Sequence, residues 1–131
     1  MKIEQLRIGN WVWDDYSGEM IVKEIEKGNN EHDFVGLCKG WSNVIGKYNV
    51  AMIQPIFITE EWLKKLGFTD VRKYNPNAGY EIKIPGGCLR SYWNGRILIC
   101  SHDDTIGFYC EYVHQLQNLY FALTQEELKI K

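Results

Sequence analysis

Hydrophobic residues near the C-terminus follow the spacing of an amphipathic helix, yet the same stretch carries no charged side chain. Residues 112–125 read YVHQLQNLYFALTQ. Apolar positions recur three and four residues apart, which predicts a helix that begins near Tyr112. The stripe consists of Val113, Leu116, Leu119, Tyr120 and Leu123. A helix side that faces water normally carries Lys, Glu or Arg. This helix carries His114, Gln115, Gln117 and Asn118 instead.

The polar side of this helix therefore needs partners other than water. Three arrangements are open. The amides bond to other parts of the chain, the helix contacts a second copy of the chain, or His114, Gln117 and Asn118 line a pocket. We rank them in this order, because buried polar groups have to find hydrogen-bond partners and the fold itself is the most economical source.

The first third of the chain alternates short apolar runs with turn-rich clusters, which is typical of β-structure. The pattern predicts strands at residues 6–13, 20–26 and 32–37, separated by the clusters at 14–18 and 28–30. A short strand, a turn and a second strand that ends in a charged loop resemble the opening of small SH3-like barrels. This likeness concerns the fold and carries no function.

A short helix is predicted over residues 59–66. Thr59 is a good N-cap, because its hydroxyl can accept a hydrogen bond from the first turn. Glu60 and Glu61 follow in that turn, where the helix dipole favours negative charge. Gly67 stands where helices commonly end.

An antiparallel meander is predicted next, with strands at residues 80–84, 88–93, 96–101 and 106–111. The dipeptide Asn94-Gly95 is a strong signal for a two-residue hairpin turn, and such a turn would place Leu89 opposite Cys100. Beyond the C-terminal helix, residues 124–127 have the capping-box pattern of a second helical turn, and residues 128–130 suit an edge strand.

These elements together predict an α+β fold. An SH3-like β-lobe occupies residues 1–58. Residues 59–131 form a short helix and an antiparallel β-meander that is covered by the C-terminal helix. We expect the two parts to form one compact unit.

Three segments resemble a widespread family of uncharacterised proteins of bacteria, phages and mobile elements. They are LRIGN at residues 6–10, IQPIFITEEWL at 53–63 followed by Gly67-Phe68, and HQLQNLYFALT at 114–124 followed by EEL. Gln125 stands where that family tends to have Gly. The resemblance implies a phage or mobile-element origin and supplies no activity.

Composition narrows the classes of partner. The 131 residues carry a formal net charge of −2, whereas a general nucleic-acid binder is usually basic. Aromatic residues make up 14%, which favours an aromatic-packed β-rich interior or a binding surface. No stretch has the roughly 18 apolar residues of a membrane span, and the N-terminus lacks a signal-peptide core. We therefore expect a cytoplasmic protein without a membrane partner, and free thiols at its cysteines.

Four residues have donor atoms that suit Zn²⁺: Cys100, His102, Cys110 and His114. Their spacing is unusual for a structural zinc site, so we interpret them as core residues and predict no metal and no cofactor. Cys110 and His114 could also form a nucleophile and its base. No catalytic signature flanks this pair, so a metal or thiol enzyme is an alternative and the prediction favours a non-enzyme.

Cationic and aromatic side chains alternate between residues 72 and 96. This combination suits anions, nucleotides and single strands, because cations pair with phosphate and rings stack on bases. The simpler interpretation is a hairpin whose outer face carries Arg and Tyr for solubility. The predicted ligand-binding residues are Arg90, Tyr92, Trp93 and Arg96, with His114, Gln117 and Asn118 for polar contacts.

The leading hypothesis is a non-enzymatic binding module of phage or mobile-element type. It would capture a host protein or a small anionic, nucleotide-like ligand. One alternative is a small nucleic-acid-associated protein that uses Trp11, Trp13 and Trp41. Another is a structural homo-oligomer, with a homodimer as the simplest form.

Overall fold

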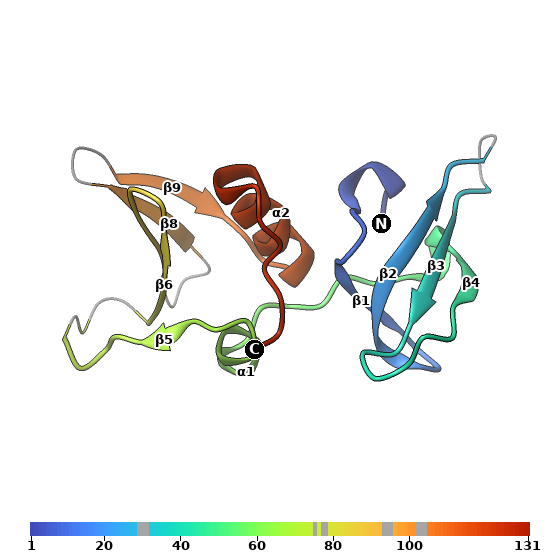
Figure 1. Cartoon of the computed structure of the whole chain (residues 1–131), viewed down its shortest axis with the longest axis horizontal. Helices are drawn as coiled ribbons and strands as arrows, with labels where there is room; N and C mark the ends of the chain where they lie inside the picture. Colours follow the sequence, from blue (N-terminus) through green and yellow to red (C-terminus); the bar gives the residue numbers. More distant parts are fainter. Residues whose placement is uncertain (29–31, 75, 77–78, 93–95, 102–104) are drawn as a thin grey trace. The chain divides into compact units, whose positions relative to one another are not determined.

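The computed structural model describes residues 1–28, 32–74, 76, 79–92, 96–101 and 105–131. It has an α+β fold with two antiparallel sheets and two α-helices (Figure 1). The chain divides into two compact units. Unit 1 comprises Met1–Ile56 and Tyr112–Asn118, and unit 2 comprises Phe57–Glu111 and Leu119–Lys131. The C-terminal helix contributes residues to both units.

Unit 1 contains a four-stranded antiparallel sheet with the order β1-β2-β3-β4. Its strands are β1 (Trp11–Asp14), β2 (Gly18–Glu26), β3 (Phe34–Cys38) and β4 (Gly46–Asn49). The strand β1 begins later than predicted, because residues 8 and 9 form a turn in which Gly9 has φ 99°. The strand β4 was not predicted, since Gly46–Asn49 lacks an apolar alternation.

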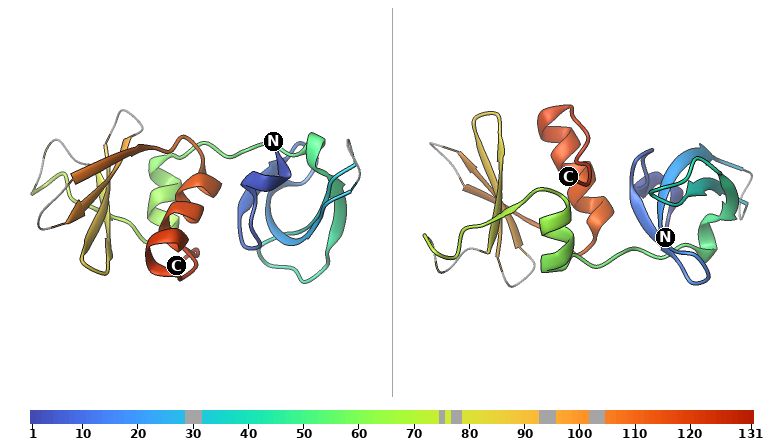
Figure 2. Two further views of the ribbon diagram at one scale, coloured as in Figure 1. Left: turned by 90° about the horizontal axis from the view of Figure 1, so that it is seen from above. Right: turned by 60° about the horizontal axis from the view of Figure 1, so that its bottom comes forward.

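In the described residues the β-lobe is an open four-stranded sheet and not a closed barrel, and its SH3-like character stays a prediction. Within the described residues β1 and β4 are the two edge strands of this sheet. Trp13 of β1 also forms an isolated antiparallel bridge with Gln54. Figure 2 shows this sheet from two further directions, in which its strands curve around the interior of the unit. Short 3-10 helices at Ile3–Gln5 and Val50–Met52 complete the unit.

The core of unit 1 consists of side chains from alternate strand positions, as expected for a sheet with one buried face. Val12, Val22, Val35 and Leu37 are fully buried. The two 3-10 helices and their flanks add Ile3, Leu6, Val50 and Ile53 to the same cluster.

Unit 2 begins with the helix α1 (Glu60–Lys65), which confirms the predicted short helix. The Thr59 hydroxyl caps it by accepting a hydrogen bond from the Trp62 backbone N–H at 3.2 Å. A five-stranded antiparallel sheet with the order β5-β6-β7-β8-β9 follows. Its strands are β5 (Thr69–Asp70), β6 (Tyr80–Ile84), β7 (Gly87–Ser91), β8 (Arg96–Ser101) and β9 (Thr105–Tyr109). The strands β6 and β8 have the predicted bounds.

The pairing of β7 with β8 differs from the prediction by one residue. Leu89 lies opposite Ile99 rather than Cys100, and the Tyr92 N–H donates to the Arg96 carbonyl at 2.8 Å. Three residues, 93–95, therefore separate the last paired residues instead of two, and Asn94-Gly95 itself lies outside the described residues. A shift of one residue changes which side chains share a face. The observed register places Leu89 and Ile97, which are 0% and 2% exposed, on one buried face.

The C-terminal helix α2 (Val113–Thr124) has the predicted position. It ends because Gln125 adopts a left-handed conformation with φ 60°. The predicted second helical turn and edge strand are wrong, since residues 125–131 contain no helix or strand. In unit 2 the C-terminal half of α2 and the helix α1 lie on the same side of the five-stranded sheet (Figures 1 and 2).

Neither helix in the described part of the chain has the length and apolar character that crossing a bilayer requires.

Candidate functional site

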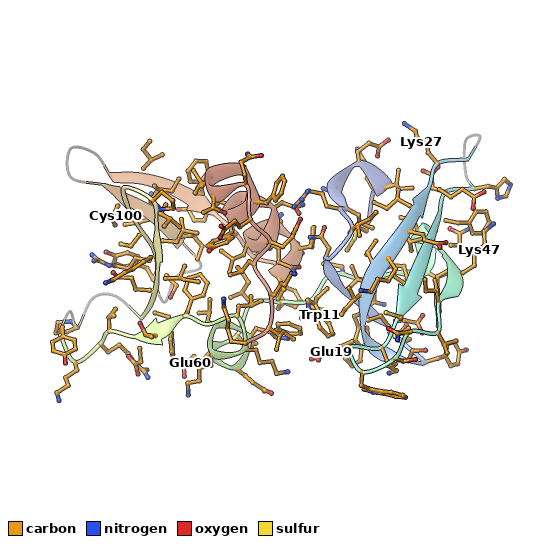
Figure 3. All side chains as sticks on the ribbon, viewed as in Figure 1. Trp11, Glu19, Lys27, Lys47, Glu60 and Cys100 are labelled. Atoms are coloured by element: carbon orange, nitrogen blue, oxygen red, sulfur yellow. The ribbon has the colours of Figure 1, made fainter. Side chains whose placement is uncertain are left out.

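Gln117 is the most deeply buried polar residue of α2, with 1% of its surface exposed. Its side-chain carbonyl accepts a hydrogen bond from the Trp11 N–H at 2.9 Å, and its amide nitrogen donates to the Gly9 carbonyl at 3.0 Å. Both bonds lie in unit 1, at the point where the chain enters β1 (Trp11 is labelled in Figure 3). One side chain thus satisfies two backbone groups that would otherwise lose water on folding.

Asn118 and Asn10 form the second polar contact of this helix within unit 1. The Asn10 side chain donates to the Asn118 side-chain oxygen at 2.9 Å, and the Asn118 amide donates to the Gln5 carbonyl at 2.9 Å. Asn10 is fully buried and also accepts from the Arg7 N–H at 2.7 Å. The amides of Gln117 and Asn118 are therefore engaged inside the unit, which corresponds to the first of the three arrangements considered from the sequence.

His114 has a different environment. It is 3% exposed, its ring stacks on Tyr112 with 5.9 Å between the centroids, and its Nδ1 has no hydrogen-bond partner among the described residues. Burial lowers the pKa of His114, and the positive N-terminal ammonium group lowers it further. The folded protein therefore holds this imidazole in its neutral form near pH 7.

This lowered pKa makes the stability of unit 1 sensitive to acid. Between the folded pKa and the ordinary value of about 6.5 the unfolded chain binds a proton at residue 114 that the folded chain does not. The free energy of unfolding should therefore fall as the pH drops from 7.5 to 5.5. We expect His114→Gln to lose less stability over this range than the parent protein in urea titrations. His32 is exposed, so His32→Gln is the matched control and should behave as the parent does. Equal losses in all three proteins would contradict the expectation.

The predicted cations of unit 2 have partners on one face of the sheet. Arg90 forms an ion pair with Glu81 at 3.2 Å, with side chains 25% and 22% exposed. The Tyr92 side chain and then Glu81 raise the pKa of Arg90. The Arg96 guanidinium lies over the Tyr109 ring, 5.3 Å from its centroid. Trp93, the remaining predicted residue of this set, lies outside the described residues.

A pocket of about 360 Å³ lies at the opposite face, entirely within unit 2. It is formed where the N-terminal turn of α1 meets the start of β6 and the adjoining ends of β7 and β8. Among the described ligand-binding residues predicted from the sequence, only Tyr92 lines this pocket, together with Cys110 from the metal and thiol alternatives. Its lining consists of Ile58, Thr59, Glu60, Leu63, Arg72, Pro76, Gly79, Tyr80, Ser91, Tyr92, Ile97 and Cys110.

A charged network forms the polar side of this pocket (Glu60 is labelled in Figure 3). Arg72 contacts Glu60 at 3.2 Å and Asp70 at 2.6 Å, and its guanidinium lies 5.5 Å from the centroid of the Tyr80 ring. The Tyr80 hydroxyl donates to the second Glu60 oxygen at 3.4 Å. The hydrogen bond from the Arg72 side chain, followed by one from its backbone, lowers the pKa of Asp70 to about 2.

The buried end of the pocket is built by Tyr80 and Ser91. Tyr80 is 2% exposed, and its backbone N–H donates to the Ser91 hydroxyl oxygen at 2.9 Å. The Gly79 N–H donates to the Ser91 carbonyl at 2.8 Å. A serine hydroxyl that accepts a hydrogen bond in this way can also donate one. Sequence reasoning missed Glu60, Arg72 and Tyr80 as neighbours, because they are brought together only by the packing of α1 on the sheet.

The cysteine chemistry considered from the sequence has little support in the geometry. Burial raises the pKa of Cys110 to about 11, so this thiol is protonated at neutral pH and is a poor nucleophile. Cys110 and His114 belong to different units. His102 lies outside the described residues, and the described residues contain no cluster of three side chains that could hold a metal ion.

Comparison of this chain with protein-family models, curated proteins and solved structures gave no match in any of the three.

Proposed function

We propose that this protein is a non-enzymatic binding module and that the pocket of unit 2 holds a small, flat, amphipathic ligand of the nucleobase or nucleoside class. The observation that carries this proposal is the pocket itself. One unit combines an apolar wall, a buried tyrosine and a ring of hydrogen-bonding groups around a single cavity.

The dimensions and walls of the pocket support a ligand of this class. Ligand sites commonly have volumes of about 300–1,000 Å³ and mostly apolar walls with a few placed polar groups. This pocket has about 360 Å³, at the small end of that range. Ile58, Leu63 and Ile97 provide aliphatic surface, and a flat ring system buries much apolar area against such walls.

The polar groups of the pocket match the edge of a base better than they match a free anion. Glu60 accepts hydrogen bonds, whereas Arg72 and the Ser91 hydroxyl donate them. The charge of Arg72 is already balanced by Asp70 and Glu60. A negative group would thus meet no unbalanced positive charge there. The anionic part of the ligand predicted from the sequence stays a prediction, with Arg90 and Arg96 as its candidate partners.

Titration of the full chain with the four common nucleosides and their monophosphates tests this function. Amide chemical shifts in a ¹⁵N-labelled sample should change at pocket residues when a nucleoside binds. We expect Ile58→Trp to weaken that binding by about tenfold or more, equivalent to about 1.4 kcal/mol, because the larger ring fills the cavity. The matched control is Ile106→Trp, the same change at a residue that is 54% exposed and does not line the pocket.

A second matched pair tests the role of Glu60 in binding, and the comparison of nucleosides with monophosphates tests the charge of the ligand. Glu60 lines the pocket and its neighbour Glu61 does not. Glu60→Gln should weaken nucleoside binding more than Glu61→Gln does. Monophosphates that bind at least tenfold more tightly than nucleosides would support the anionic ligand predicted from the sequence. The proposed ligand class would be overturned if none of the eight compounds changed an amide chemical shift at a pocket residue.

Three finer expectations stay proposals that rest on the sequence alone. They are the SH3-like character of unit 1, a phage or mobile-element origin, and capture of a host protein. For the SH3-like character, the antiparallel sheet of unit 1 supports only the coarser expectation of a β-lobe. Trp41, named for the nucleic-acid alternative, is 86% exposed. That alternative predicts binding that weakens steeply with salt.

A further inference from the structure

Two cysteines lie directly opposite each other on neighbouring strands of unit 2. In the antiparallel pairing of β7 with β8, Cys88 faces Cys100, and ordinary pairs flank them on both sides at Gly87–Ser101 and Leu89–Ile99. Cα atoms of opposed residues in such sheets are about 4.5–5.5 Å apart. Disulfides take Cα separations of about 4.4–6.8 Å. The backbone spacing of this opposed pair therefore lies within the Cα range that a disulfide spans.

The two thiols differ in access. Cys88 is 7% exposed, whereas Cys100 is partly exposed (labelled in Figure 3). A dissolved oxidant therefore meets Cys100 first. The other two cysteines lack such a pairing: Cys38 lies opposite Ile21 in unit 1, and Cys110 follows the end of β9.

We propose that Cys88 and Cys100 are a redox modification site, which forms a reversible cross-strand disulfide when the protein meets a peroxide. This site is independent of the pocket proposed above, because Cys88 and Cys100 do not line that pocket.

The reaction balances as a two-electron oxidation. The Cys100 thiolate attacks one peroxide oxygen, the O–O bond breaks, and hydroxide leaves while Cys100 becomes a sulfenic acid. The Cys88 thiolate then attacks the Cys100 sulfur, the S–O bond breaks, and the second hydroxide leaves. With the two protons released by the thiols, two waters form for each hydrogen peroxide consumed. A dithiol reductant restores both thiols.

The surroundings of Cys88 disfavour it as the first attacker, whereas its position opposite Cys100 favours the second step. Burial, and then the nearby Glu81 carboxylate, raise the pKa of Cys88 to about 11. At neutral pH this thiol is therefore a weak first attacker on peroxide. Once Cys100 is a sulfenic acid, the opposed position of Cys88 makes the second step intramolecular and favours the disulfide over further oxidation.

The bond would close a loop of residues 88–100 and so restrict the unfolded chain more than the folded one. The thermal midpoint of unit 2 should rise by several degrees on oxidation and return after treatment with a dithiol.

The experiment treats the folded full chain with hydrogen peroxide, blocks remaining thiols, and maps tryptic peptides without reduction. Cleavage after Lys83, Arg90 and Arg96 places Cys88 in peptide 84–90 and places Cys100 and Cys110 together in peptide 97–129. The parent protein and Cys110→Ser should both link these two peptides. Cys100→Ser and Cys88→Ser should not.

Several results would overturn the proposal. They are a link that survives in Cys100→Ser, a link that forms only in denaturant, and conversion of Cys100 to a sulfinic acid while Cys88 stays reduced. Cys88→Ala provides a second variant if the buried serine prevents folding, and its Cys100 should then accumulate as the sulfenic acid. Amide spectra of each variant before oxidation establish that it is folded.

Discussion

Replacing Gln117 with leucine should lower the free energy of unfolding of unit 1 by about 2–5 kcal/mol. The residue is 1% exposed, so leucine would remove both hydrogen bonds without admitting water. The Trp11 N–H and the Gly9 carbonyl would then be buried without partners, and each such group costs about 1–3 kcal/mol. The gain from burying a larger apolar side chain offsets only part of this loss.

Hydrogen exchange reports this loss residue by residue. The backbone amides of Val12, Val22 and Val35 belong to the fully buried core of unit 1, so their exchange measures the stability of that unit. Gln54→Leu supplies the same chemical change at an exposed position and should stay within about 0.5 kcal/mol of the parent. Equal losses in the free energy of unfolding for Gln117→Leu and Gln54→Leu would show that β1 does not depend on the side-chain amide of Gln117.

Replacing Tyr80 with alanine should destabilise unit 2 by about 3–5 kcal/mol, as is usual for truncation of a buried aromatic ring. Tyr80 is 2% exposed and lines the pocket, and its ring centroid lies 5.5 Å from the Arg72 guanidinium. Tyr80→Phe keeps that ring and removes only the hydroxyl, whose contacts to Glu60 and Arg72 are long, at 3.4 and 3.5 Å. The phenylalanine variant should therefore lose no more than about 1 kcal/mol.

Exchange at the amides of Leu89 and Leu98, in the centre of the same sheet, measures this difference. A phenylalanine variant as unstable as the alanine variant would place the stabilisation in the hydroxyl and its charged neighbours instead of in the packed ring. The two variants also separate roles in binding, because Tyr80→Phe should keep the shape of the pocket and change only one hydrogen-bonding group.

Local signals were sufficient for several elements. The helix α1 follows from a capping threonine, two acids and a closing glycine within nine residues, so no distant contact was needed to predict it. The strands β6 and β8 follow from alternation between turn residues. The strand β4 and the register of β7 against β8 were missed. Both depend on which faces are buried, and that is a property of the whole sheet.

The end of α2 shows how a local pattern can mislead. The capping-box pattern at residues 124–127 predicted a new helical turn. In the structure the Thr124 hydroxyl accepts instead from the Glu126 N–H at 3.0 Å, and Gln125 takes the left-handed conformation that ends the helix. The same hydroxyl can serve a helix start or a helix end, and its sequence neighbours do not distinguish the two uses.

By itself, the sequence determined that α2 would be a helix with an uncharged polar side and that this side would need partners, because spacing and desolvation are local properties of those residues. Only the tertiary structure decided which partners they are. Gln117 and Asn118 bond to groups more than 100 positions away, at residues 5–11, and any buried backbone amide would have met the same chemical need. The pocket arises in the same way, since Glu60, Arg72, Tyr80 and Ser91 become neighbours only when α1 packs on the sheet.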